Sequence, residues 1–207
     1  MKELKAVIWD LGGVLIDWNP NYVYEHYFES PEKLKYFFDN VCTSDWNEEQ
    51  DAGRLISVAT EELIKKHPEW EKAIRDYYGR WTEMLRGPIE GTVEIFDELR
   101  KNHELKFYAL TNWSAETFPY ALEHYEFLHW FDGRVVSGEE KMRKPATEFY
   151  KLLLNRYNLH SSEVIFIDDN LRNVNAAREL GIRSIHFHSP AQLRGELEKL
   201  NLVVPRS

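Results

Sequence analysis

The chain has 207 residues, of which 43% are apolar and 29% charged, so its composition excludes a disordered or fibrous protein. The formal net charge is −9 and the basic residues are scattered, which argues against nucleic acid as a partner. No apolar stretch approaches the roughly 18 residues of a membrane span, and the single cysteine, Cys42, favours a reducing compartment, so we expect a cytoplasmic protein.

The chain opens on a short apolar run, Ala6–Trp9, that stops at Asp10 and is followed by Gly12 and Gly13. This pattern is typical of a buried strand that ends in a tight loop. Asp10 is therefore expected at the carboxyl end of the first strand.

From Asn19 to Leu85, apolar residues recur at helical spacing, and this part of the chain is predicted to be all helix. No flexible linker or internal repeat accompanies it, so it is best interpreted as an insertion after the first strand. We predict an α/β core formed by residues 1–16 and 88–207, and a helical cap formed by residues 17–87.

Strands and helices alternate after residue 88. Strands are predicted at 106–110, 134–136, 164–167 and 183–187, and helices at 92–102, 115–125, 146–157, 173–180 and 191–200. This alternation predicts a Rossmann-like, doubly wound parallel sheet.

Ligands of such sheets bind beyond the carboxyl ends of the strands, and those ends carry polar residues here. They are Asp10, Thr111-Asn112, Lys144 and Asp168-Asp169-Asn170. Each of these alone is as well explained by a helix cap, a turn or a solvated surface. All of them at successive strand ends favour a functional site.

The four segments resemble, in this order, the four motifs of the haloacid dehalogenase superfamily. They read Trp9-Asp10-Leu11-Gly12-Gly13-Val14, Leu110-Thr111-Asn112, Arg143-Lys144-Pro145 and Ile167-Asp168-Asp169-Asn170. The resemblance covers nearly the whole chain, although the helical segment resembles the small cap of that family only in position and helical content. It implies a hydrolase that acts on a small phosphorylated metabolite, as a monomer or homodimer, without a nucleic-acid or membrane partner.

Attack of a carboxylate on a phosphoryl group requires that the repulsion between two anions be cancelled. The resemblance implies that Asp10 is the nucleophile and forms an aspartyl-phosphate. It implies a Mg²⁺ site made by Asp10, the backbone carbonyl of Gly12 and Asp169, with Asp168 in support. It also implies that Thr111, Asn112, Lys144 and Gly12 surround the phosphoryl group and that Lys144 ties it to Asp10.

Gly12 departs from the family pattern, because most phosphatases of this superfamily have a second aspartate there as general acid and base. Three interpretations remain open. The first is a phosphatase similar to the bacterial sugar-phosphate phosphatases that act on glucose 1-phosphate, which also lack this carboxylate. The second is a 2-haloacid dehalogenase, in which Asp10 displaces halide without metal. The third is a phosphometabolite-binding protein with weak turnover.

Specificity is expected from the helical cap, where polar and aromatic residues cluster. The candidate pocket residues are Trp18, Tyr22, Trp46, Asp51 and Arg54. Asp45-Trp46-Asn47 and Asp51-Ala52-Gly53-Arg54 are expected to form a loop. Trp113, which follows Asn112, is expected either to line the pocket mouth or to pack beneath the cap.

Overall fold

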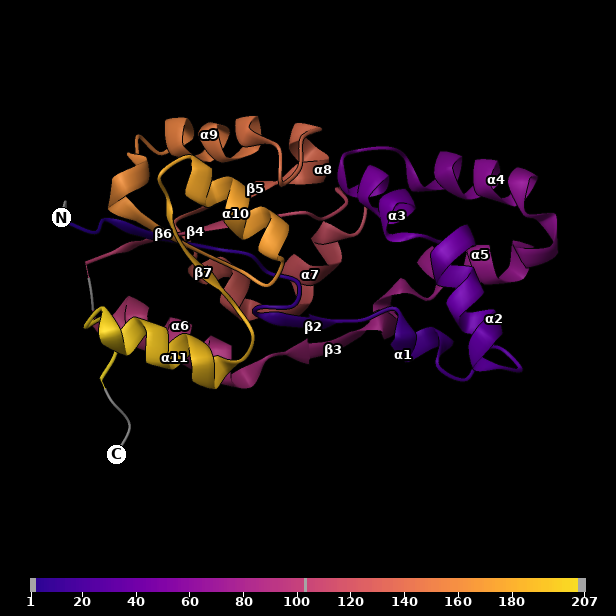
Figure 1. The fold of residues 1–207 in the computed structure, drawn as a ribbon, viewed down its shortest axis with the longest axis horizontal. Coiled ribbons are helices and arrows are strands. Elements are labelled where there is room, and N and C mark those ends of the chain that lie inside the picture. The colour runs from indigo at the N-terminus through magenta and orange to yellow at the C-terminus, as the bar shows by residue number, and fades with distance from the viewer. Residues whose placement is uncertain (1–2, 103, 205–207) are drawn as a thin grey trace.

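The computed structural model describes residues 3–102 and 104–204 and contains a five-stranded parallel sheet (Figure 1). Its strands run in the order β5-β4-β1-β6-β7. They are β1 (Ala6–Trp9), β4 (Lys106–Thr111), β5 (Gly133–Val136), β6 (Val164–Asp168) and β7 (Arg183–His186). The predicted doubly wound α/β fold is confirmed.

Both faces of the sheet are covered by helices, which explains why the central strands β1, β4 and β6 are mostly apolar runs without alternation. Figure 1 shows α6 (Glu90–Asn102) and α11 (Pro190–Lys199) on one face, and α9 (Thr147–Arg156) and α10 (Leu171–Glu179) on the other. Successive residues of β1 supply the two cores: Val7 and Trp9 pack in one apolar cluster, and Ala6 and Ile8 in the other.

The strand order determines which chain segments meet at the carboxyl edge of the sheet. β1 lies between β4 and β6, with Trp9 opposite Ala109 on one side and Ile167 on the other. Asp10 therefore emerges between the ends of β4 and β6, although those strands lie far along the chain. Ligand-binding residues of an open parallel sheet are expected at this position.

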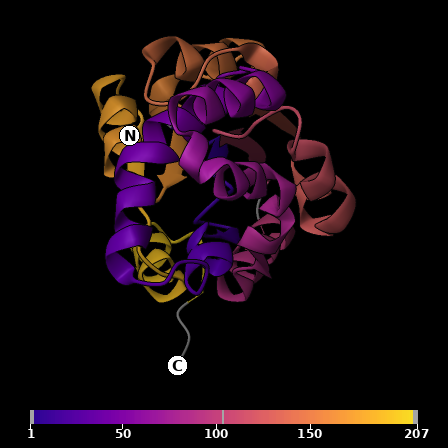
Figure 2. The ribbon, with the colours of Figure 1, turned by 90° about the vertical axis from the view of Figure 1, so that its right-hand side faces the viewer.

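Residues 17–87 form a largely helical body beside this edge, on the right of Figure 1 and facing the viewer in Figure 2. Its α-helices are α1 (Asn21–Tyr24), α2 (Pro31–Tyr36), α3 (Ser44–Asp51), α4 (Ile56–Lys66) and α5 (Glu71–Gly79), and a π-helical turn, Phe37–Val41, follows α2. Aromatic rings fill its interior: the Tyr24 ring lies 4.9 Å from that of Phe37 and 6.2 Å from that of Tyr77, between centroids.

The prediction of helix throughout residues 19–85 is wrong at its end. Leu85–Pro88 is strand β3, which pairs antiparallel with β2 (Ile16–Trp18). Gly87 and Pro88 are usually signals of a turn, and neither strand has enough residues to show a period of two. This two-stranded ribbon joins the helical body to the sheet (Figure 1).

The loop expected at Asp45-Trp46-Asn47 is also wrong, because these residues belong to α3. The Thr43 side chain accepts a hydrogen bond from the Trp46 N–H and caps the start of that helix. The helix predicted at 115–125 is shorter, since α7 is Phe118–His124 and a turn precedes it. A short helix after β5, α8 (Ser137–Glu140), was not predicted.

Cys42 is buried, as expected for an apolar thiol. Among the residues that the structure describes, no helix combines the length and the apolar character needed to cross a bilayer.

Candidate active site

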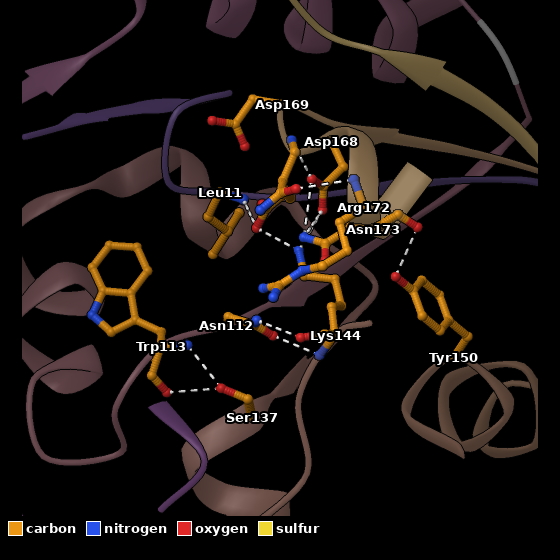
Figure 3. A network of polar contacts seen from close by, with 12 residues as sticks. Leu11, Asn112, Trp113, Ser137, Lys144, Tyr150, Asp168, Asp169, Arg172 and Asn173 are labelled. Atoms are coloured by element: carbon orange, nitrogen blue, oxygen red, sulfur yellow. Dashed lines mark hydrogen bonds and ion pairs between the residues drawn. The ribbon is translucent and has the colours of Figure 1, made fainter. Parts of the chain in front are cut away.

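Lys144 is the centre of a buried charge cluster at the carboxyl edge of the sheet (Figure 3). Its Nζ lies 2.9 Å from Asp10 Oδ1 and 2.7 Å from Asp168 Oδ2. The Lys144 side chain is fully buried, and the two carboxylates outweigh the cost of that burial and raise the pKa of the lysine. The ammonium group is therefore held in its charged form between the ends of β1 and β6.

Asp168 is fixed by several donors besides Lys144. Its carboxylate accepts hydrogen bonds from the Asn170 N–H at 2.7 Å and from the Asn173 side-chain amide at 3.1 Å. Asn170 in turn caps α10, because its side chain accepts from the Arg172 N–H. Asp168 therefore orients Lys144. Of the three polar residues at the end of β6, Asn170 is the one that caps α10.

Asp169 is exposed toward the cavity and lies against Gly13. Gly13 has a φ of +74°, and a Cβ built on it would come within 2.3 Å of Asp169 Oδ2. Glycine is thus required here by both backbone conformation and close approach. Gly13 therefore lets the Asp10 loop pass beside the end of β6.

Three carboxylates converge in this cluster. One oxygen from each of Asp10, Asp168 and Asp169 lies within 4.8 Å of the others. Burial raises the pKa of Asp10, and Asp168 and Asp169 raise it further, whereas Lys144 opposes the rise. Burial and Asp168 likewise raise the pKa of Asp169. One ammonium group therefore does not balance three carboxylates.

A hard divalent cation fits this donor set, since Mg²⁺ binds carboxylate and carbonyl oxygens and would offset the remaining negative charge. The three carboxylates expected from the sequence, Asp10, Asp168 and Asp169, are close enough to one another to hold it. The contribution of the Gly12 backbone carbonyl stays a prediction.

Thr111 and Asn112 follow β4 and have different environments. The Thr111 hydroxyl is buried and has no hydrogen-bond partner within the described protein, which leaves it available to a ligand oxygen. The Asn112 side chain instead bonds the Lys144 backbone twice, donating to its carbonyl at 3.0 Å and accepting from its N–H at 2.8 Å. The Asn112 side chain therefore positions Lys144.

A cavity of about 560 Å³ opens over the cluster, a size suited to a small metabolite. Asp10, Gly12, Asn112 and Asp169 line its floor, and residues of the helical segment line its other side. A side pocket continues from it between aromatic residues, among them Trp18, Tyr78, Trp81 and Trp113.

Of the five candidates from the helical segment, the structure brings Trp18 and Asp51 to the cavity. Tyr22 instead donates to Asp17 at 2.9 Å, and Arg54 pairs with Glu49 and Glu62. Trp46 packs against the rings of Tyr77 and Tyr78 within the helical body. These three expectations are wrong, because polar and aromatic composition does not tell which face of a helix meets the cavity.

Tyr78 and Trp81 also line the pocket, although their helical spacing within residues 19–85 predicts only that they are apolar positions of a helix. Asn47 lies beside them on α3. Trp113 satisfies both alternatives: it lines the pocket mouth, and its ring packs edge-on against Trp81, 5.9 Å away. Nothing in the periodicity separates a pocket aromatic from a core aromatic.

Residues 7–187 match the family described as haloacid dehalogenase-like hydrolase. A sesquiterpene phosphatase of Aspergillus oryzae is 31% identical over 95% of this chain and 96% of its own length. A phosphorylated carbohydrates phosphatase of Thermotoga maritima is 25% identical over 88% of this chain and 84% of its own. A drimenol cyclase of Aspergillus calidoustus is 28% identical over 95% of this chain, which spans only 36% of that protein.

Two solved structures share the fold. A HAD-like hydrolase of Porphyromonas gingivalis has a TM-score of 0.71 at 17% identity, with 97% of this chain and 98% of that chain covered. A magnesium complex of a HAD family enzyme from Bacteroides thetaiotaomicron has a TM-score of 0.69 at 22% identity, with 91% of this chain and 95% of that chain covered.

Proposed function

The chain belongs to the haloacid dehalogenase-like hydrolases, and on that premise we propose that it is a Mg²⁺-dependent phosphatase of small phosphorylated metabolites. The observation that carries the proposal is the set of three carboxylates within 4.8 Å of one another beside a single lysine. Such a site suits a divalent cation together with a phosphoryl anion. Two of the similar proteins are phosphatases by name.

In the proposed reaction, Asp10 attacks phosphorus and the bond to the leaving oxygen breaks, giving an aspartyl-phosphate that water then hydrolyses. Lys144 holds the attacking carboxylate and neutralises charge on the phosphoryl oxygens. The Thr111 hydroxyl and the backbone N–H of Asn112 would donate to the same oxygens. When bound, Mg²⁺ would supply further neutralisation of the phosphoryl charge.

We further propose that residues 17–87 act as a cap on a catalytic core formed by residues 1–16 and 88–207. The cavity supports this division, because its floor comes from the sheet edge and its opposite wall from the helical segment. A cap of this kind would exclude water and choose among leaving groups.

Two substrate classes deserve direct comparison. A sugar phosphate is favoured if no other residue replaces the carboxylate that Gly12 lacks, since an anomeric leaving oxygen needs little protonation, and one similar protein acts by name on phosphorylated carbohydrates. A phosphorylated apolar alcohol is favoured by the aromatic pocket, and another similar protein is by name a sesquiterpene phosphatase. The values of kcat/KM for glucose 1-phosphate and farnesyl phosphate would rank them.

A 2-haloacid dehalogenase remains the alternative enzyme, but it would leave Asp168 and Asp169 repelling the Asp10 carboxylate without a cation between them. A phosphate-binding protein of weak turnover is the alternative without efficient catalysis.

The deciding experiment measures phosphate release from a panel of phosphorylated metabolites and halide release from 2-haloacids, each with Mg²⁺ and with chelator. We expect phosphate release that stops on chelation. Halide release that survives the chelator would establish the dehalogenase. Tight binding of the phosphorylated compounds without turnover in Mg²⁺ would establish the binding protein.

A further inference from the structure

Gly12 leaves an open space beside the nucleophile. A Cβ built on Gly12 would meet no other atom within 4 Å, so the backbone there has room for a side chain that this sequence lacks. The space belongs to the cavity over Asp10. A group that protonates the leaving oxygen must therefore reach it from another part of the chain.

Asp51, the last residue of α3, lines both the cavity and its aromatic side pocket, as does Gly12. Among the described residues lining this space, Glu48 is paired with Arg143 and Arg172, and Asp10 and Asp169 belong to the charge cluster. Among these residues, the Asp51 carboxyl belongs neither to an ion pair nor to the charge cluster. It receives the Ser114 N–H and, at 3.3 Å, the side-chain amide of Asn47.

The end of α3 is attached to the segment that follows Thr111 and Asn112. The Ser137 hydroxyl donates to the Asp51 carbonyl at 2.5 Å. It also accepts from the Trp113 N–H at 2.8 Å, as Figure 3 shows. Together with the Ser114 N–H, these contacts fix Asp51 relative to the residues expected to hold the phosphoryl group. A carboxyl fixed in this way does not depend on an unconstrained loop for its position.

We propose that Asp51 is the general acid and base of this enzyme, taking the place of the carboxylate that Gly12 lacks. The inference rests on the proposed phosphatase function and deepens it. Asp51 is the catalytic residue that the helical segment contributes, and its partner in the reaction is the leaving-group oxygen.

The protons balance over the two steps. As the Asp10 oxygen bonds to phosphorus and the bond from phosphorus to the leaving oxygen breaks, the neutral Asp51 carboxyl gives its proton to that oxygen and the alcohol departs. The Asp51 carboxylate then takes a proton from the attacking water as the bond from phosphorus to Asp10 breaks. Inorganic phosphate leaves, and Asp51 is neutral again.

The environment of Asp51 suits this role. Burial raises its pKa to about 7, while the Ser114 N–H and the charge of Lys144 limit the rise. Among the described residues that line the same space, burial also raises the pKa values of Tyr77, Tyr78 and Cys42 above their ordinary range, so these groups stay neutral. An acid that titrates near neutrality can act in both directions of proton transfer.

The test compares the wild-type chain, Asp51→Asn and Asp45→Asn on aryl and alkyl phosphates whose alcohols span a wide range of acidity, in Mg²⁺. Asparagine keeps the size of Asp51 and can still accept the Ser114 N–H, and the thermal midpoint checks folding. Asp45 is an exposed carboxyl on the same helix. For the least acidic alcohols, Asp51→Asn should lower kcat/KM by about 10²–10⁴-fold. For p-nitrophenyl phosphate the loss should stay within about tenfold, and Asp45→Asn should match wild type throughout.

An equal loss on every leaving group, or none, would overturn the role of Asp51 while the phosphatase activity of the wild-type chain stood. A wild-type chain inactive on the whole series would reject the phosphatase function and this inference together.

Adding Gly12→Asp to Asp51→Asn should restore activity on the less acidic alcohols, because the space at residue 12 is open. If Asp51→Asn does not fold, the wild-type chain alone provides the test, through the dependence of log kcat/KM on the pKa of the leaving alcohol. A weak dependence is expected if Asp51 protonates the leaving oxygen. A strong decrease of the rate with rising alcohol pKa would contradict proton donation.

Discussion

The sheet edge and the helical segment contribute to the same cavity in different ways. At the sheet edge, charged groups are buried and held by several partners each, as Lys144 is by Asp10 and Asp168. The helical segment presents aromatic and uncharged polar side chains with two carboxyls, of which Glu48 is ion-paired and Asp51 belongs to no ion pair among the described residues. The difference suggests that the sheet edge determines the reaction and the helical segment determines which leaving group is accepted and protonated.

The strongest test of this comparison is Asp10→Asn. If the sheet edge carries the reaction, losing the nucleophile should lower kcat by about 10⁴-fold or more, whatever the leaving group. Steady-state phosphate release in Mg²⁺ measures it. Asp97→Asn is the matched control, since Asp97 pairs with Arg100 and Lys101 on α6, away from the cavity. Turnover that persists within about tenfold of wild type would remove Asp10 from the mechanism.

Lys144→Met tests whether the sheet-edge cluster is also a structural unit. It would leave two buried carboxylates without their ammonium partner, so the free energy of unfolding should fall by about 3–5 kcal/mol. Urea unfolding in chelator measures the change, with the exposed Lys151→Met of α9 as control. A loss below about 1 kcal/mol would mean that the cluster neutralises itself by proton uptake.

Trp18→Ala tests whether the helical side governs the leaving group. Trp18 lines both the cavity and the aromatic pocket. Loss of its ring should lower kcat/KM for bulky leaving groups by about 10-fold and leave methyl phosphate nearly unchanged. Tyr36→Ala removes an exposed ring outside the cavity and should change neither. An equal loss on large and small substrates would place Trp18 in the general folding of the site.

The smallest expected effect is on stability and concerns Asp51. Its pKa is ordinary in the unfolded chain but about 7 in the folded one, so wild-type stability should fall as the pH rises between those values. Asp51→Asn has no such loss. Near pH 8 its free energy of unfolding should exceed that of wild type by about 1–2 kcal/mol, which is less than the full pKa shift would give because the Asp51 side chain is partly exposed. Urea unfolding at about pH 5 and pH 8 in chelator measures this. Parallel pH profiles for the two proteins would contradict it.

The sequence by itself determined the α/β fold and the convergence of Asp10, Lys144, Asp168 and Asp169. Apolar runs that end in polar residues identify strand ends, and parallel pairing brings those ends to one edge whatever the loops between them do. The strand ends were predicted to within a few residues, because each run is short and bounded by polar or small residues, and the runs of β1 and β6 are fully buried.

Only the tertiary structure decided the other side of the cavity. Asp51 contacts Ser114 and Ser137, which lie far from it along the chain. Trp46 and Trp81 both lie in the segment predicted to be helical or loop, yet Trp46 packs in the interior and Trp81 lines the pocket. The spacing of apolar residues predicts that a side chain is buried. Which residues that side chain contacts depends on how α3 and α5 pack against the sheet edge. That choice depends on long-range contacts, for which a short window of sequence has no signal.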